Sequence, residues 1–209
     1  MSSAPPHDRL VPVDKGATPV ELARLHARGV QRVYRGAERL TIGMPCGGIA
    51  AGQLYVLGDG RLGCWQIDGG MYFSGYGADN YRTYRPPQAI AQGFSLTVTD
   101  ADGTPTRVVL SDADYDAIEF VGEYPRALIR YRAQDKPVPP VDVDLEVFSP
   151  FIPLDARNSA WPATVLRFTL HNRADRSLDI GLTGWLQNIA FADAKDALLI
   201  ERRVEPVQT

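Results

Sequence analysis

The fold class is decided by one glycine-rich stretch of the sequence. It runs Gly43-Met44-Pro45-Cys46-Gly47-Gly48-Ile49-Ala50-Ala51-Gly52, and continues Gln53-Leu54-Tyr55-Val56-Leu57-Gly58-Asp59-Gly60-Arg61-Leu62-Gly63-Cys64-Trp65-Gln66-Ile67. The two apolar runs flank Gly58-Asp59-Gly60, and Asp-Gly between strand-like runs is a strong hairpin signal because glycine adopts positive φ freely. The stretch therefore predicts a β-hairpin with Trp65 on the return strand, entered through glycines that suit a sharp turn or close backbone packing.

These glycines do not make a nucleotide site. A dinucleotide fingerprint needs glycines at its first, third and sixth positions before a helix, but the third position from Gly47 is Ile49 and a strand follows. A phosphate loop needs Gly-Lys-Ser/Thr, and the sequence has no lysine between Lys15 and Lys136.

Composition also excludes several classes of function. Of 209 residues, 44% are hydrophobic and 22% charged, which is typical of a globular chain, and the net charge of −3 offers no basic surface for nucleic acid. The cysteines, Cys46 and Cys64, lack a CxxC spacing, so they indicate buried thiols in preference to a zinc site or a disulfide. No signal peptide or transmembrane run is seen, so we expect a cytoplasmic protein, with peripheral membrane association left open.

The sequence divides into three parts. Residues 1–17 are rich in proline and charge, which predicts a flexible arm. Residues 18–35 predict a short helix over 18–28 and a linker, with Thr18 and Glu21 as a capping box, Pro19 in the first turn and Gly29 at the C-terminal end. Residues 36–209 predict an antiparallel β-sandwich domain.

Period-two alternation of apolar residues carries the sandwich prediction. Expected strands cover 39–42, the hairpin, 94–98, 106–110, 117–121, 127–132, 141–147, 164–170, 178–186 and 198–200. Many short strands separated by turns are typical of a sandwich. Two segments interrupt the pattern and predict loops: an aromatic one over 69–87 and a proline-punctuated one over 148–155.

Three segments resemble the N-terminal domain of glycoside hydrolase family 116, the family of the non-lysosomal glucosylceramidase or bile-acid β-glucosidase. They are the glycine-rich stretch with its hairpin, Phe148-Ser149-Pro150-Phe151-Ile152-Pro153-Leu154-Asp155 leading to Asn158-Ser159, and Val165-Leu166-Arg167-Phe168-Thr169-Leu170-His171-Asn172. The resemblance spans roughly residues 30–190. Ala50-Ala51-Gly52 stands where the family commonly has Gly-Thr-Gly, a departure that keeps the residues small.

The resemblance implies a β-sandwich followed by an α/α barrel, and retaining hydrolysis of a β-glucoside or glucosylceramide-like substrate. Retention uses two carboxyl groups about 5–5.5 Å apart, and in the family both belong to the barrel. We therefore expect no catalytic residue, cofactor or metal in this chain and no activity of the chain alone. Its expected partner is the C-terminal α/α barrel, and the sandwich would be cut at Thr209, leaving the strand over 198–200 unpaired.

Candidate substrate or domain-interface residues lie on the two loops and the hairpin. They are Trp65, Tyr72, Phe73, Tyr76, Phe151, Asp155 and Asn158. The aromatic residues suit docking of the barrel or edge packing, contact with a sugar face, or an ordinary surface loop. If they dock a domain, both loops should lie on one side of the sandwich as an apolar face.

Other carboxylates favour a solvated role. Asp142, Asp144 and Glu146 alternate on one strand, which predicts its wet face, and residues 112–116 carry three aspartates without the glycine and glutamate of a calcium loop.

Three hypotheses for the function of the chain follow: a supporting sandwich of a β-glucosidase, a free-standing carbohydrate-binding sandwich, or an inert fragment. The coding sequence downstream of residue 209 would distinguish the first two.

Overall fold

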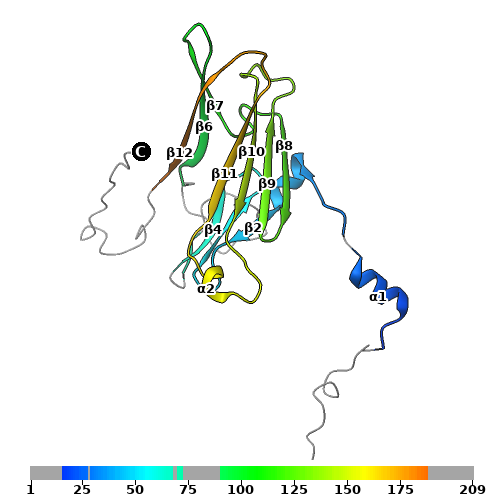
Figure 1. Cartoon of the computed structure of the whole chain (residues 1–209). Coiled ribbons are helices and arrows are strands. Elements are labelled where there is room, and N and C mark those ends of the chain that lie inside the picture. Colours follow the sequence, from blue (N-terminus) through cyan, green and yellow to red (C-terminus); the bar gives the residue numbers. More distant parts are fainter. Residues whose placement is uncertain (1–15, 28, 68–69, 73–89, 188–209) are drawn as a thin grey trace, which may run out of the picture. The chain divides into compact units, whose positions relative to one another are not determined.

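The structure is a computed structural model that describes residues 16–27, 29–67, 70–72 and 90–187. The chain divides into two compact units, Met1–Gln31 and Arg32–Thr209, and each is described by itself. Figure 1 traces both units and labels their elements.

The first unit contains helix α1 (Pro19–His26), which begins as the sequence predicts. The Thr18 hydroxyl accepts from the Glu21 N–H, and the Glu21 carboxylate accepts from the Thr18 N–H at 2.8 Å, which completes the capping box. The helix ends at His26 with Ala27 as its C-cap, so the expectation of Gly29 as its cap was wrong. In the part of the chain that is described, no helix is long and apolar enough to cross a membrane.

The second unit holds three antiparallel sheets (Figure 1). The five-stranded sheet has the order β1-β8-β9-β10-β11, the three-stranded sheet β12-β6-β7 and the four-stranded sheet β2-β3-β4-β5. The strands of the first sheet are β1 (Tyr34–Arg35), β8 (Ala117–Glu123), β9 (Arg126–Arg132), β10 (Val141–Phe148) and β11 (Val165–Asn172). The others are β12 (Asp179–Leu186), β6 (Gln92–Thr99) and β7 (Pro105–Val109), then β2 (Gly43–Cys46), β3 (Gln53–Leu57), β4 (Leu62–Ile67) and β5 (Gly70–Tyr72).

The core lies where the inner faces of these sheets meet. The aliphatic residues at alternating positions of β10 are buried, and one cluster joins their side chains to those of the other two sheets, among them Val56 of β3 and Leu96 of β6. The Phe94 ring of β6 packs edge-on against Phe168 of β11, with ring centres 4.9 Å apart. Antiparallel sheets that pack around one shared core confirm the predicted β-sandwich.

The predicted hairpin is formed by β3 and β4. The Gly60 N–H donates to the Leu57 carbonyl at 2.8 Å, and Gly60 has a φ of 86°, which glycine adopts without strain. The Tyr131 hydroxyl of β9 donates to the Asp59 carbonyl at 2.8 Å, so the turn is fixed to the five-stranded sheet. Cys46 and Cys64, on β2 and β4, are buried free thiols, in line with the preferred interpretation of the sequence.

The strand expected over 39–42 was wrong. A 3-10 helix, η2 (Gly36–Thr41), occupies this segment. The Glu38 carboxylate accepts from the Arg35 N–H at 3.3 Å, and the buried Arg39 guanidinium pairs with Asp112 at 2.5 Å. The Arg39–Asp112 pair joins residues far apart in the sequence, and the bond to Glu38 comes from the backbone N–H of Arg35. Neither contact affects the period-two pattern of residues 39–42, so that pattern could not distinguish a 3-10 helix from a strand.

One other expectation needs correction, because strand β5 pairs with β4 where residues 69–87 were expected to be loop. A short helix that was not predicted, α2 (Ala156–Ser159), follows the proline-punctuated segment. The remaining predicted strands up to 186 are confirmed within a few residues. The strand expected over 198–200 lies outside the described residues.

The aspartates of residues 112–116 are not simply solvated. Asp114 accepts from the Val109 N–H at 2.6 Å, and Asp116 accepts from the Gln134 and Asp135 N–H groups at 2.8 Å. They tie the segment after β7 to the backbone around it.

Candidate functional site: the glycine-loop edge

The glycine-rich loop and the proline-punctuated segment with α2 meet at one edge of the sandwich. The loop between β2 and β3, residues 47–52, lies against the end of helix α2, where the Ile49 N–H donates to the Ser159 carbonyl at 2.8 Å. In Figure 1, α2 lies at the same end of the unit as β2 and β4. Segments more than a hundred residues apart in sequence therefore build one local structure.

Gly48 makes this contact close. A Cβ atom at Gly48 would lie 2.7 Å from the Ala160 carbonyl carbon and 2.8 Å from its oxygen, and closer still to the Trp161 carbonyl oxygen. Real Cβ atoms do not approach backbone so closely. The predicted close approach of the glycine-rich stretch is thus observed, and its surface is the backbone that follows α2.

The segment between β10 and β11 is held by its own polar side chains. The buried Ser159 hydroxyl accepts from the Ile152 N–H at 2.8 Å and donates to the Ile152 carbonyl at 3.1 Å. Asp155 caps α2, accepting from the Asn158 N–H at 3.0 Å and from its side-chain amide at 2.6 Å. These hydrogen bonds hold the pKa of Asp155 below its usual range. The two candidate residues Asp155 and Asn158 therefore bind each other.

Large apolar side chains gather on this edge. Tyr124, in the turn between β8 and β9, packs edge-on against Phe151 with ring centres 5.4 Å apart. The set, which we call the edge patch, has six members, each at least 41% exposed: Ile49, Tyr124, Phe151, Ile152, Leu154 and Trp161. Leu154 is fully exposed and has a φ of 67°, a strained conformation for leucine. Exposed apolar clusters of this kind mark interaction surfaces.

Two open pockets flank the glycine-rich loop. One, of about 310 Å³, is lined by the loop together with Gln53, Gln66 and Tyr124. The other, of about 320 Å³, is also lined by part of the loop, together with Leu54, Trp65 and residues 162–164. Trp65 is partly buried, and through this second pocket it faces the same connection between β10 and β11 that carries Phe151.

The remaining aromatic candidates are placed only in part. Tyr72 lies on β5, directly across from Trp65 of β4. Phe73 and Tyr76 lie outside the described residues. Tyr124 and Trp161 were not predicted as site residues. Each is an aromatic residue directly before a proline, Pro125 or Pro162, and this pattern is the sequence signal that could have identified them.

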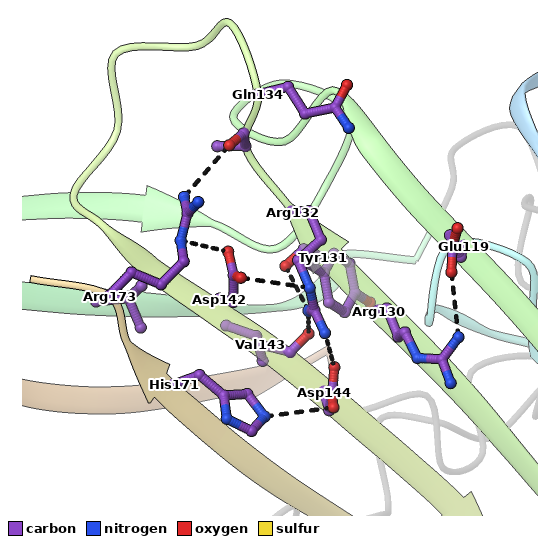
Figure 2. Close-up of polar contacts among 12 residues, drawn as sticks. Glu119, Arg130, Tyr131, Arg132, Gln134, Asp142, Val143, Asp144, His171 and Arg173 are labelled. Carbon is purple, nitrogen blue, oxygen red and sulfur yellow. Dashed lines mark hydrogen bonds and ion pairs between the residues drawn. The ribbon is translucent and has the colours of Figure 1, made fainter.

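The outward face of the five-stranded sheet carries a second polar feature, a ladder of ion pairs (Figure 2). Asp142 contacts Arg132 at 3.4 Å and Arg173 at 2.9 Å, and Asp144 contacts Arg132 at 2.5 Å and the His171 ring at 3.3 Å. The structure confirms that these residues share a polar face of the strand. The prediction that this face is wet was wrong for Glu146, which is buried, and Asp142 and Asp144 are largely covered by their partners.

The ladder extends to both sides of Asp144. Glu146 contacts Arg126 at 3.1 Å and also Arg167, while Glu119 contacts Arg130 at 3.1 Å. Burial disfavours the charged form of Glu119, but hydrogen bonds from Arg35 and Arg130 outweigh it and hold the pKa of Glu119 below its usual range.

This arrangement does not suit acid–base hydrolysis. A glycosidase acid must carry a proton and approach the glycosidic oxygen, whereas the carboxylates of the ladder accept from positively charged side chains. Among the described residues, no group of three or more His, Cys, Asp or Glu side chains is placed to hold a metal ion.

Comparison with known proteins identifies one family. Residues 43–205 match the family described as beta-glucosidase 2, glycosyl-hydrolase family 116 N-term. No curated protein matches the chain. The matched range begins at β2 and contains the glycine-rich loop, the edge patch and the ladder.

Proposed function

The chain belongs to the family of glycosyl-hydrolase family 116 N-terminal domains, and from this membership we propose that it is the non-catalytic sandwich of a retaining β-glucosidase of the glucosylceramidase type. In the whole enzyme a C-terminal α/α barrel would carry both catalytic carboxyl groups. The substrate would be a β-glucoside or a glucosylceramide-like lipid. The sandwich would support the barrel and help to shape its cleft.

The pairing of the carboxylates supports a non-catalytic role. Retaining hydrolysis needs a nucleophile and a protonated acid about 5–5.5 Å apart on either side of a bound sugar. On the sheet face, Asp144 and Glu146 are instead each held by arginine. Their contacts are those of a structural surface.

The observation that carries the supporting role is the edge patch. Its six apolar side chains come from three segments whose backbones are fixed by hydrogen bonds and close packing. A rigid apolar surface loses little conformational entropy when a partner covers it. We assign this surface to the barrel, with Leu154 and Trp161 as its most exposed side chains.

One observation favours a second candidate, a free-standing carbohydrate-binding module. The pocket beside Gln53 and Gln66 has no charged residue among the described residues that line it, which suits a neutral sugar. Under this alternative the chain would bind sugar but would not associate with a barrel.

The experiment joins this chain to the α/α barrel of a family 116 enzyme and measures hydrolysis of an aryl β-glucoside. We expect no turnover by the chain alone and turnover by the joined protein. Leu154→Asp and Trp161→Asp should each weaken domain docking by about tenfold or more, because each loses an apolar contact worth roughly 1.5–3 kcal/mol. Leu182→Asp, at an exposed leucine of β12 outside the patch, is the matched control.

Two results would contradict the proposal. One is turnover by the purified chain that disappears when a single Asp or Glu of the chain is replaced. The other is equal loss of docking in the Leu182 and Leu154 variants.

A further inference from the structure

The pocket between the glycine-rich loop and Tyr124 has the chemistry of a small neutral site. Its volume of about 310 Å³ is at the lower end of the range for ligand pockets, which suits one sugar ring better than a long glycan. Gln53 and Gln66 supply its polar side chains, Tyr124 supplies an aromatic one, and the described lining contains no Asp, Glu, Lys, Arg or His.

The two glutamines are positioned by the hairpin. Gln53 of β3 and Gln66 of β4 are cross-strand partners, and the Gln53 Nε2 donates to the Gln66 Oε1 at 2.8 Å. A primary amide has two N–H donors and an oxygen with two lone pairs, so this bond uses only part of each group. A carbonyl acceptor on Gln53 and an amide donor on Gln66 remain side by side. Vicinal hydroxyl groups, each both donor and acceptor, match this pair.

Defined contacts hold the walls of the pocket in place. The loop is fixed by the bond from the Ile49 N–H to Ser159 and by the packing of Gly48 against residues 160–161. The Tyr124 ring is about half exposed and is oriented by its edge-on contact with Phe151. A tyrosine presents an apolar face for the C–H face of a sugar and a hydroxyl for its polar rim. Preorganised walls of this kind reduce the entropic cost of binding.

We propose that this pocket binds a single hexose unit of a neutral β-glucoside, through the Gln53–Gln66 amide pair and the Tyr124 ring. The assignment of glucose rests on the proposed function, whereas the preference for a neutral polyhydroxylated ligand rests on the pocket itself. Ile49 and Tyr124 line the pocket and also belong to the edge patch, so a barrel docked on the patch would stand beside the bound sugar.

The test titrates the ¹⁵N-labelled chain with methyl β-D-glucopyranoside and, in parallel, with the anionic methyl β-D-glucuronide. We expect saturable shifts of the Gln53 and Gln66 side-chain amide signals, with a Kd of about 1 mM, typical of a small site. The glucuronide should bind more weakly, because its carboxylate finds no cation in the described lining. Gln66→Ala should raise the Kd about tenfold, since it removes the amide N–H that would donate to the ligand and also removes the hydrogen-bond partner of Gln53.

Matched variants separate binding from folding. Tyr124→Ala alters an exposed turn residue and should also raise the Kd, without depending on the strand pairing of Gln66. Gln134→Ala, an exposed glutamine after β9, should leave the Kd unchanged. Absence of saturable shifts, tighter binding of the glucuronide, or unchanged affinity in both Gln66→Ala and Tyr124→Ala would overturn the site.

Failure of this site and failure of the proposed function give different results. If the chain binds no glucoside but the joined enzyme hydrolyses one, only the pocket assignment is wrong. If the chain binds glucoside but neither docks a barrel nor supports hydrolysis, the pocket stands and the supporting role is wrong.

Discussion

Replacing Gly48 with alanine tests whether the glycine-rich loop is packed against the backbone after α2. The new methyl group would lie 2.7 Å from the Ala160 carbonyl carbon and 2.8 Å from its oxygen. Relief requires one backbone segment to move, because neither neighbouring atom belongs to a flexible side chain. Such overpacking costs about 1–3 kcal/mol. Separation of the segments would also lose the bond from the Ile49 N–H to Ser159, worth about 1 kcal/mol.

The expected loss in the free energy of unfolding is therefore about 2–4 kcal/mol. Urea unfolding followed by circular dichroism would measure it, and the slope of the transition should not change. The matched control is Gly181→Ala on β12, where the atoms nearest to the new methyl group would lie 4.0 Å away and space is ample. That variant should be as stable as the wild type or slightly more stable.

Equal stability of the Gly48 and Gly181 variants would refute the close contact. A loss of stability without any change in the binding of methyl β-D-glucopyranoside would keep the contact but remove its role in shaping the pocket.

Three further predictions address other contacts. Tyr131→Phe should lower the free energy of unfolding by about 1 kcal/mol, because the bond to the Asp59 carbonyl is lost, and urea unfolding would show no change if that bond were absent. The hydrogen bonds from Arg176 and from the Ala101 N–H lower the pKa of Asp100 to about 2, so its contribution to stability should be present above about pH 4 and lost as the pH falls toward 2. Arg176→Gln should raise that pKa toward its ordinary value of 3.8 in an NMR titration, and an unchanged pKa would contradict the pairing. Burial raises the pKa of the Cys46 thiol to about 11, so a thiol reagent at pH 8 should label it only after unfolding, and rapid labelling of the native chain would show that it is accessible.

The strands were predictable where alternation was long. Residues 141–147 alternate without interruption, and the hairpin combines two apolar runs with an Asp-Gly turn, so local chemistry alone determines both elements. Residues 39–42 show why a short alternation is weaker. The buried Arg39 pairs with Asp112, which lies 73 residues away, so this contact leaves no trace in the local pattern.

The candidate site was predictable in part for a similar reason. The sequence indicates that Phe151 is too apolar for an ordinary loop, and that glycines 47 and 48 need space. It does not indicate that the two segments touch, because that contact depends on how the sheets are stacked. Tyr124 joins the same edge only because β8 and β9 end there.

Strand β10 pairs with β9 and β11 on its two sides, and it has one aliphatic face and one acidic face. This difference between the faces disfavours pairing of the strand in a wrong register. A slip of one residue would turn Asp142, Asp144 and Glu146 into the core and expel the aliphatic side chains. An uncompensated buried carboxylate costs several kcal/mol, so misregistered sheets lie far above the native one in free energy. A chain that pairs these strands out of phase while folding has no stable trap in which to remain.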